Sequence, residues 1–361
     1  MARHPAFPVF LALAIGLVAG SCAARPKAVA DRAGVARPLW KFRTGGFVDS
    51  TPIVSGGAVY FGSWDRRLYA LDAATGKVLW SLESGDFIDA SPAVSGGRVF
   101  FCSWNRIVQC VDGASGETVW RFEMPPSLQD DHRQSSPAVS GGRVLVGGFN
   151  GVLYALDEET GRKLWELPTE GAIRSRPSPA GFAGSGDGHL YAFRTADGKE
   201  RWRFRAGGAV HSAPVEADGR VFFGARDGGV YCLNGETGER VWRYDTGSRL
   251  EYSSALLSGE VLYIGDCDGV LHAVDPRDGK PVWRFRGEGA IYSTPVVVNG
   301  LVAYGDNAGK AYFLDPGTGE LAGSYRAGGP IQAIAPGPGN SVYLGSRDGY
   351  LHAVSVSRAE R

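Results

Sequence analysis

The sequence predicts an all-β protein, an eight-bladed β-propeller of four-stranded blades closed by an N-terminal strand that joins the last blade. Three observations support this prediction. Tryptophans recur at intervals of about 40 residues, tight hairpin turns recur with the same period, and the body of the chain nowhere sustains the apolar periodicity of a helix. Four short strands in a repeat of this length are typical of propeller blades.

An aromatic residue marks the last strand of each unit. Tyr325 is expected in the place equivalent to the tryptophans, and a Thr-Gly or Asp-Gly turn such as Thr75-Gly76 precedes most of these strands. The tryptophans that define the repeat are Trp40, Trp80, Trp120, Trp165, Trp202, Trp242 and Trp283.

A second turn lies upstream of these strands and predicts a β-hairpin. Asn-Gly and Asp-Gly pairs supply the positive φ angles of tight hairpins, and flanking runs such as residues 59–61 and 68–71 are β-prone. Eight such turns indicate eight blades: Asp65-Arg66, Asn105-Arg106, Asn150-Gly151, Asp187-Gly188, Asp227-Gly228, Asp268-Gly269, Asn307-Ala308 and Asp348-Gly349.

The two ends of the repeat region predict how the ring closes. The chain stops after its last hairpin without a tryptophan strand, whereas the strand around Trp40 has no hairpin before it. Pairing this strand with the last blade supplies the missing fourth strand and removes an open edge. The propeller is therefore expected over residues 38–357, with a tail at 358–361.

The first residues resemble an export signal. A basic start precedes an apolar run over residues 6–19, which is too short to span a bilayer, and small residues follow it up to Cys22. This pattern predicts a signal peptide at residues 1–21.

The cysteine after these small residues is similar to the lipobox of bacterial lipoproteins, although Ala19 stands where that motif usually has leucine. The resemblance implies lipidation of Cys22, with residues 22–37 forming the anchored cysteine and a flexible tether. Since Ala23 rather than aspartate follows, it also implies the outer membrane. An ordinary cleaved signal with an incidental cysteine is the alternative.

The charge balance bears on the class of partner. Lys plus Arg and Asp plus Glu both number 38, so the chain has no net field that would attract nucleic acid. We expect no nucleic-acid partner, and membrane contact only through the lipid anchor.

The segment from Leu68-Tyr69-Ala70-Leu71-Asp72 through Thr75-Gly76 to Trp80 resembles the repeat of quinoprotein-type propellers, and the resemblance covers roughly residues 38 to 357. Two groups share this repeat. One comprises the pyrroloquinoline quinone-dependent alcohol dehydrogenases; the other comprises non-catalytic propellers, including BamB-type lipoproteins of the outer-membrane β-barrel assembly machinery. The fold by itself does not choose between them.

The dehydrogenase alternative implies pyrroloquinoline quinone with Ca²⁺ as cofactor. Those enzymes are longer, carry large insertions between blades, and typically have a disulfide between adjacent cysteines, whereas no two cysteines are adjacent here. Asp49 and Asp89 could contribute to a Ca²⁺ site, but no further oxygen ligands with that family's spacing are visible. We therefore expect no catalytic residue, no metal and no cofactor.

The cysteines beyond the proposed anchor leave two interpretations open. In an exported protein they could form disulfides, with three possible connectivities. Buried or tolerated free thiols are the favoured interpretation. These cysteines are Cys102, Cys110, Cys232 and Cys267.

The mouth of the central channel is the first candidate binding region. The position three residues before the proline of most first strands, with its equivalents in the sixth and eighth units, should form a ring there, and it varies from acidic to basic to aromatic while the scaffold repeats. A small ligand would bind in this funnel, although a solvated ring without a ligand is an equal alternative. The ring is Asp49, Asp89, Gln134, Arg174, His211, Tyr252, Tyr292 and Gln332.

A second candidate region lies where the repeat is irregular. Aromatic side chains occupy hairpin turns and connections of adjacent blades on one face, where they either pack between blades or form a binding hot spot. An arginine stands beside the short fourth unit, which follows the one long connection of the chain at residues 124–133. The residues of this predicted partner surface are Phe47, Trp64, Phe87, Trp104 and Arg176.

These observations favour a monomeric, non-catalytic, lipid-anchored scaffold that binds an envelope protein, with the barrel-assembly complex as the partner implied by the resemblance. It would lie on the outer membrane and face the periplasm. The alternatives are a propeller that binds pyrroloquinoline quinone or another small ligand, as a dehydrogenase or sensor, and an envelope lipoprotein with an unrelated partner.

Overall fold

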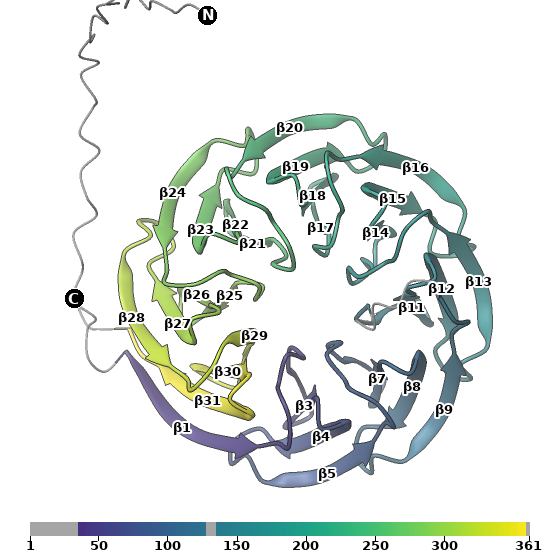
Figure 1. Ribbon diagram of the computed structural model, residues 1–361, viewed down its shortest axis with the longest axis horizontal. Coiled ribbons are helices and arrows are strands. Elements are labelled where there is room, and N and C mark those ends of the chain that lie inside the picture. Colours follow the sequence, from purple (N-terminus) through teal and green to yellow (C-terminus); the bar gives the residue numbers. More distant parts are fainter. Residues whose placement is uncertain (1–34, 128–134, 359–361) are drawn as a thin grey trace, which may run out of the picture. The chain divides into compact units, whose positions relative to one another are not determined.

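The computed structural model describes residues 35–127 and 135–358, and its sheets form a ring around a central axis (Figure 1). The predicted signal peptide, Cys22, most of the tether, Gln134 and the 128–133 part of the long connection lie outside the described residues. Seven sheets have four strands and one has three. In each sheet, neighbouring strands are antiparallel, which confirms the predicted eight-bladed all-β propeller.

The innermost strands are short and face the axis. Prolines and small polar residues precede them, so the chain enters each blade extended and close to its neighbours. They are β2 (Ile53–Ser55), β6 (Ala93–Ser95), β10 (Ala138–Ser140), β17 (Val215–Ala217), β21 (Leu256–Ser258), β25 (Val296–Val298) and β29 (Ile331–Pro336).

The second strands are almost entirely buried, because both faces of each blade pack against neighbouring blades. Their valine, tyrosine and phenylalanine side chains suit a pleated surface that is covered on both sides. They are β3 (Ala58–Gly62), β7 (Arg98–Cys102), β11 (Arg143–Gly147), β14 (Phe182–Gly184), β18 (Arg220–Gly224), β22 (Val261–Gly265), β26 (Leu301–Gly305) and β30 (Ser341–Ser346).

The third strands complete the hydrophobic layers between blades. In the first blade, for example, Phe61 pairs with Tyr69 and Val59 with Leu71, and these four side chains belong to one cluster shared with the last blade. The third strands are β4 (Arg67–Asp72), β8 (Ile107–Asp112), β12 (Val152–Asp157), β15 (His189–Phe193), β19 (Gly229–Asn234), β23 (Val270–Val274), β27 (Lys310–Leu314) and β31 (Tyr350–Val356).

The outer strands form the circumference and alternate between exposed and packed residues. Their free edges carry exposed aliphatic side chains, such as Val78 and Leu79. They are β1 (Ala36–Arg43), β5 (Val78–Glu83), β9 (Thr118–Glu123), β13 (Lys163–Pro168), β16 (Glu200–Arg205), β20 (Arg240–Asp245), β24 (Pro281–Arg286) and β28 (Leu321–Arg326).

Each tryptophan of the repeat packs onto the next blade around the ring. A Cβ atom added to Gly116 would lie 2.7 Å from the Trp80 ring, so the indole rests directly on the glycine of the following Ser-Gly turn. The Trp80 Nε1 atom also donates to the Gly113 carbonyl at 2.9 Å. The turn glycine and the tryptophan that recur in the sequence thus contact each other across neighbouring blades.

Closure occurs as predicted. The N-terminal strand β1 pairs antiparallel with β31, with Trp40 opposite Ala353 and Arg43 opposite Tyr350. Figure 1 shows this strand, in purple, lying along the edge of the yellow last blade. Strand β1 begins at Ala36, two residues before the expected boundary at 38.

The expected place of Tyr325 is wrong. In β28, Gly323 pairs with Phe313 in the register where Trp283 pairs with Ala273 in the preceding blade. A Cβ atom on Gly323 would meet Val35 at 2.5 Å, because the incoming N-terminal chain occupies the space that a tryptophan fills elsewhere. Spacing alone therefore assigned the aromatic residue two positions too late.

The fourth blade is the irregular one. It contains only β14, β15 and β16, and an isolated bridge between Ser178 and Phe182 stands where other blades have an inner strand. The sequence predicted this weakness from the short run at residues 180–184.

The described cysteines are free thiols, in agreement with the favoured interpretation. Cys102 pairs across the sheet with Val108, and Cys110 with Phe100, so the two are not opposite each other. Burial raises the pKa of Cys110 to about 12 and that of Cys232 to about 11, which keeps both protonated at neutral pH. Within residues 35–127 and 135–358, we find no helix of the length and apolarity that crossing a bilayer requires.

Candidate functional site

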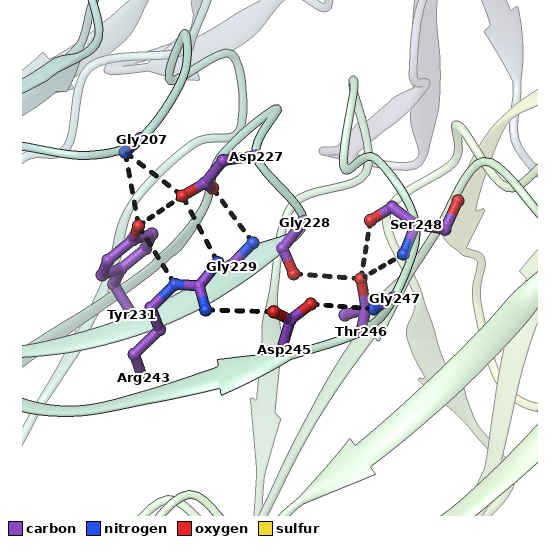
Figure 2. A network of polar contacts seen from close by, with 10 residues as sticks. All are labelled: Gly207, Asp227, Gly228, Gly229, Tyr231, Arg243, Asp245, Thr246, Gly247 and Ser248. Atoms are coloured by element: carbon purple, nitrogen blue, oxygen red, sulfur yellow. Dashed lines mark hydrogen bonds and ion pairs between the residues drawn. The ribbon is translucent and has the colours of Figure 1, made fainter.

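The face that carries the hairpin turns is held together by a repeated polar network (Figure 2). In the fifth blade the turn carboxylate of Asp227 accepts hydrogen bonds from Gly229 N at 3.0 Å, Gly207 N at 3.2 Å and the Tyr231 hydroxyl at 2.5 Å. Arg243 donates to the same hydroxyl at 3.2 Å and lies 3.5 Å from the carboxylate. One carboxylate thus joins the hairpin to the connection that enters the same blade.

Hydroxyl groups fix the rest of these connections. Thr246 Oγ1 donates to the carbonyl oxygens of Gly228 at 3.0 Å and Ser248 at 2.7 Å. The first blade repeats the carboxylate arrangement, because Asp65 Oδ2 accepts from Gly45 N and the Tyr69 hydroxyl, both at 2.7 Å. The loops of this face are consequently rigid, and a rigid face suits recognition because little conformational entropy is lost on binding.

A central cavity of about 680 Å³ opens at this face, and its size is typical of small-molecule sites. All the predicted ring residues within the described part of the chain line it: Asp49, Asp89, Arg174, His211, Tyr252, Tyr292 and Gln332.

Most charges at the mouth are paired. Arg347 donates to both carboxylate oxygens of Asp49, through Nε at 3.0 Å and Nη2 at 2.8 Å, and these bonds raise the arginine pKa. Glu251 lies 2.8 Å from Arg226 Nε and 3.5 Å from His211 Nδ1. Burial alone would raise the pKa of Glu251, but the contacts with His211 and Arg226 outweigh it and lower the pKa.

Aromatic rings form another part of the wall. His211 stacks on Tyr252 with a centroid separation of 6.0 Å, and Tyr252 meets Tyr292 edge-on at 5.6 Å. Burial raises the pKa of Tyr292, so its phenol is neutral at physiological pH. This part of the wall can contact a flat or apolar group.

The predicted aromatic residues of the partner surface form one cluster, which contacts Arg347 of the cavity wall. Trp64 contacts Phe47 at 5.3 Å, Phe87 at 5.4 Å and Trp104 at 5.1 Å between ring centroids. The backbone reinforces it, since Trp64 N donates to the Phe47 carbonyl at 2.9 Å. Inter-blade packing is therefore present, while Phe47 remains 40% exposed and available to a partner. We call these four residues the aromatic cluster.

Arg176 is not part of the aromatic cluster. It lines the central cavity beside the three-stranded fourth blade. No described residue forms a hydrogen bond, ion pair or ring contact with its side chain. The loss of surrounding water lowers the pKa of its guanidinium, although the side chain is exposed to the cavity.

Sequence reasoning missed the arginines around the aromatic cluster. The guanidinium of Arg347 lies 5.6 Å from the Phe47 ring and 5.7 Å from the Trp64 ring, and that of Arg66 lies 5.5 Å from the Phe87 ring. Such contacts are cation–π interactions. Arg347 occupies the same hairpin position in the last blade as Trp64 in the first, which is the signal that could have identified it.

The cavity wall does not fit Ca²⁺ with a bound quinone. Calcium takes six to eight oxygen ligands, but Asp49 is held by Arg347. In the part of the chain that the structure describes, no three His, Cys, Asp or Glu side chains are grouped so that they could hold a metal ion. We therefore derive no catalytic step through such a cofactor.

The sequence matches the family model of outer membrane protein assembly factor BamB over residues 27–178 and 150–357. No curated protein matches the sequence.

Three solved structures illustrate how widely the fold is shared. BamB from Moraxella catarrhalis is 18% identical with a TM-score of 0.74, over 91% of this chain and 99% of that one. The computationally designed Ika8 protein is 18% identical with a TM-score of 0.78, over 89% and 100%. A europium-containing methanol dehydrogenase is 15% identical with a TM-score of 0.75, over 89% and 93%. At these identities the likeness shows the fold alone.

Proposed function

Because the chain belongs to the family of the outer membrane protein assembly factor BamB, we propose that it is a non-catalytic, lipid-anchored scaffold for protein–protein interaction in the bacterial cell envelope. Its role is to present a rigid propeller face to a component of the outer-membrane β-barrel assembly machinery. It acts as a monomer and binds no nucleic acid.

The observation that carries this proposal is the aromatic cluster on the rigid loop face. Large rings flanked by arginines are the residue types enriched at binding hot spots. Phe47 is the exposed member, and the rings of Trp64 and Phe87 beneath it stack at 5.4 Å with an interplanar angle of 17°. A partner side chain that covers Phe47 would therefore bind to a surface that is already ordered.

The test is a pull-down from detergent-solubilised envelope with the tagged full-length protein. We expect recovery of a barrel-assembly component by the wild type and a loss of at least about tenfold with Phe47→Ser, the size expected for a hot-spot residue. Val282→Ser is the matched control, because Val282 is 49% exposed on the outer strand β24 of the sixth blade. Recovery of no such component by the wild type would refute the proposed role.

An alternative docking mode uses the free edge of an outer strand, to which a partner can add a strand of its own. Strand β5 offers such an edge, with Leu79 55% exposed. Leu79→Pro removes one backbone donor and disfavours strand addition. Loss of the partner with Leu79→Pro but not with Phe47→Ser would move the docking site from the aromatic cluster to this edge.

The placement of the protein is part of the same proposal. Residues 1–21 are proposed as the signal peptide, Cys22 as the acylated anchor, residues 22–37 as the tether, residues 38–357 as the propeller and 358–361 as a tail. The outer membrane, facing the periplasm, is the proposed location. Cys22→Ala should release the protein from the membrane fraction; unchanged membrane association of this variant would contradict the anchor.

A second candidate function is binding of pyrroloquinoline quinone or another small ligand in the central cavity. The 680 Å³ cavity and its tyrosine wall favour a small ligand, whereas the missing metal-ligand cluster weighs against the quinone with Ca²⁺. Adding both to the purified protein and recording a quinone spectrum and dye-linked alcohol oxidation tests this candidate. A bound quinone that oxidises alcohol would replace the scaffold proposal.

A further inference from the structure

The inner ends of the blades are joined by a ring of hydroxyl groups. In this ring, the residue just before the inner-strand proline, or before Ala255 in the sixth blade, accepts a hydrogen bond from a backbone N–H of the preceding blade. Thr51 N donates to Ser91 Oγ at 2.9 Å, and Ser91 N donates to Ser136 Oγ at 2.9 Å. Ala213 N and Ser254 Oγ repeat the contact at 2.8 Å. This position therefore has a clear structural role in several blades.

Arg176 occupies the same position in the fourth blade and has no hydroxyl to offer. The fold does not require an arginine there, because a serine or threonine would continue the ring. The chain instead places at the wall of a cavity of about 680 Å³ a guanidinium with which no described residue pairs. At a cavity wall, a guanidinium without an opposite charge beside it is stabilised when an anion binds to it.

The other charges of the cavity do not supply that charge. Asp49 is bound by Arg347, and no carboxylate within ion-pair distance of Arg176 occurs among the described residues. Three arginines, Arg174, Arg176 and Arg347, face two aspartates on the wall, so the cavity favours an anion. Because Asp89 and Asp49 would repel a second negative charge, a monoanion fits better than a dianion.

The neighbouring blades supply a surface for the rest of such a ligand. His211, Tyr252 and Tyr292 follow Arg176 in the fifth, sixth and seventh blades, and their rings contact one another in sequence. We propose that Arg176 binds a carboxylate, and that the apolar or aromatic group bearing it lies against these rings. The carboxylate belongs either to a free small molecule or to the C-terminus of a peptide that enters the mouth. This inference does not rest on the proposed scaffold function.

Calorimetric titration of the purified full-length protein tests the proposal. The probes are benzoate, inorganic phosphate, and the peptide Ala-Ala-Ala-Phe with a free or an amidated C-terminus. We expect benzoate and the free-carboxylate peptide to bind, and Arg176→Ser to weaken both by at least about tenfold, as loss of a charged hydrogen bond implies. Arg205→Ala is the matched control, since Arg205 is an exposed arginine on the outer strand of the same blade.

The variants separate binding from folding. Arg176→Ser introduces the hydroxyl that other blades carry, so it should fold and melt no lower than the wild type, and Arg176→Lys should retain part of the affinity. Tighter binding of the free-carboxylate peptide than of benzoate identifies a chain end as the source, and the reverse identifies a small molecule. Equal binding by wild type and Arg176→Ser, no binding of either carboxylate, or tighter binding of phosphate would each overturn the proposal.

Discussion

On the third strand, near the hairpin turn, histidine replaces tyrosine in two blades. In the first and fifth blades a tyrosine on the third strand binds the turn aspartate, as Tyr231 binds Asp227. In the last blade His352 takes this place, and its Nε2 lies 3.0 Å from Asp348 Oδ2. The other ring nitrogen, Nδ1, then needs a partner, and Tyr325 supplies a hydroxyl at 3.0 Å. In the sixth blade His272 also replaces the tyrosine and contacts the Tyr244 hydroxyl, but its carboxylate partner is Asp266, two residues before the turn aspartate. In the first, third, fifth and seventh blades the third strand has tyrosine and its neighbour is phenylalanine, as in the pair Phe204 and Tyr231.

This exchange makes stability depend on pH. Burial lowers the pKa of His352 below 6.5, and this effect outweighs the charge of Asp348, which acts in the opposite direction. The unfolded chain therefore takes up a proton near pH 6.5 that the folded chain does not. Stability is greatest above pH 6.5 and falls as the pH drops toward the folded pKa, with a slope of at most about 1.4 kcal/mol per pH unit for this residue.

The double variant His352→Tyr with Tyr325→Phe restores the arrangement of the other blades and removes this titration. We expect its free energy of unfolding, measured in urea between pH 7.5 and 5, to fall less steeply than that of the wild type. The single variant Tyr325→Phe keeps the histidine and serves as control. Parallel pH profiles of the double variant and the wild type would contradict the assignment.

The sequence identified residues that line the cavity, because one channel-facing position in one blade gives the equivalent position in every other blade. It could not show which of them are neutralised. Asp49 and Arg347 are separated by 298 positions in the chain, and only closure of the ring brings them together. That no described residue pairs with Arg176 could not be predicted either, since it depends on the side chains that surround the cavity.

At the scale of the strand and turn, the contact between a tryptophan and the next blade's glycine is the recurring joint. Gly116 has a φ of 75° and carries the Trp80 ring, whereas Gly97 has a φ of 77° and nothing within 4 Å of its would-be Cβ. The two glycines lie in the same blade and have nearly the same positive φ. They differ in whether a neighbouring blade occupies the space beside them.

This pair separates backbone strain from packing. Gly97→Ala should cost about 1 kcal/mol, the price of a left-handed conformation for alanine. Gly116→Ala adds a clash with Trp80 and should cost about 2–4 kcal/mol in total. Urea unfolding of both variants measures the difference, and equal losses would show that the indole contributes nothing to the joint.

The spacing of about 40 residues predicted the strands of the regular blades. It failed where the contact between tryptophan and the next blade's glycine is altered. The period placed an aromatic residue at Tyr325, but backbone pairing puts Gly323 in that register. The reason is physical: Val35 already fills the space beside Gly323, and a sequence period carries no information about a segment that arrives from the other end of the chain.

At the scale of the whole propeller, stability depends on strand β1. This strand is the first in the sequence, but it lies in the last blade. Strand β1 pairs with β31 over its whole length, and Trp40 packs on Gly76 of the first blade. It therefore joins the last blade and the first one at once.

Removing residues 36–43 from the otherwise intact protein should leave β31 with a free edge and expose the apolar cluster beneath Trp40. We expect aggregation on purification, or a melting temperature at least about 5 °C lower, because several kcal/mol of burial are lost. Size-exclusion chromatography and a thermal melt measure this. Removing the four residues 358–361 is the control and should change neither; a monomeric truncation that melts like the wild type would disprove the closing role of β1.

The strand that closes the ring also sets an order of events in time. The ribosome makes β1 first, yet its partner β31 is complete only when Val356 has been added. At about 5–20 residues per second this interval lasts roughly 15 to 60 seconds. Until then the pairing of β1 with β31 that closes the ring cannot form. The ring of a newly made chain therefore stays open until its last strand has been synthesised. A chain that lacks the last blade cannot close the ring by this pairing.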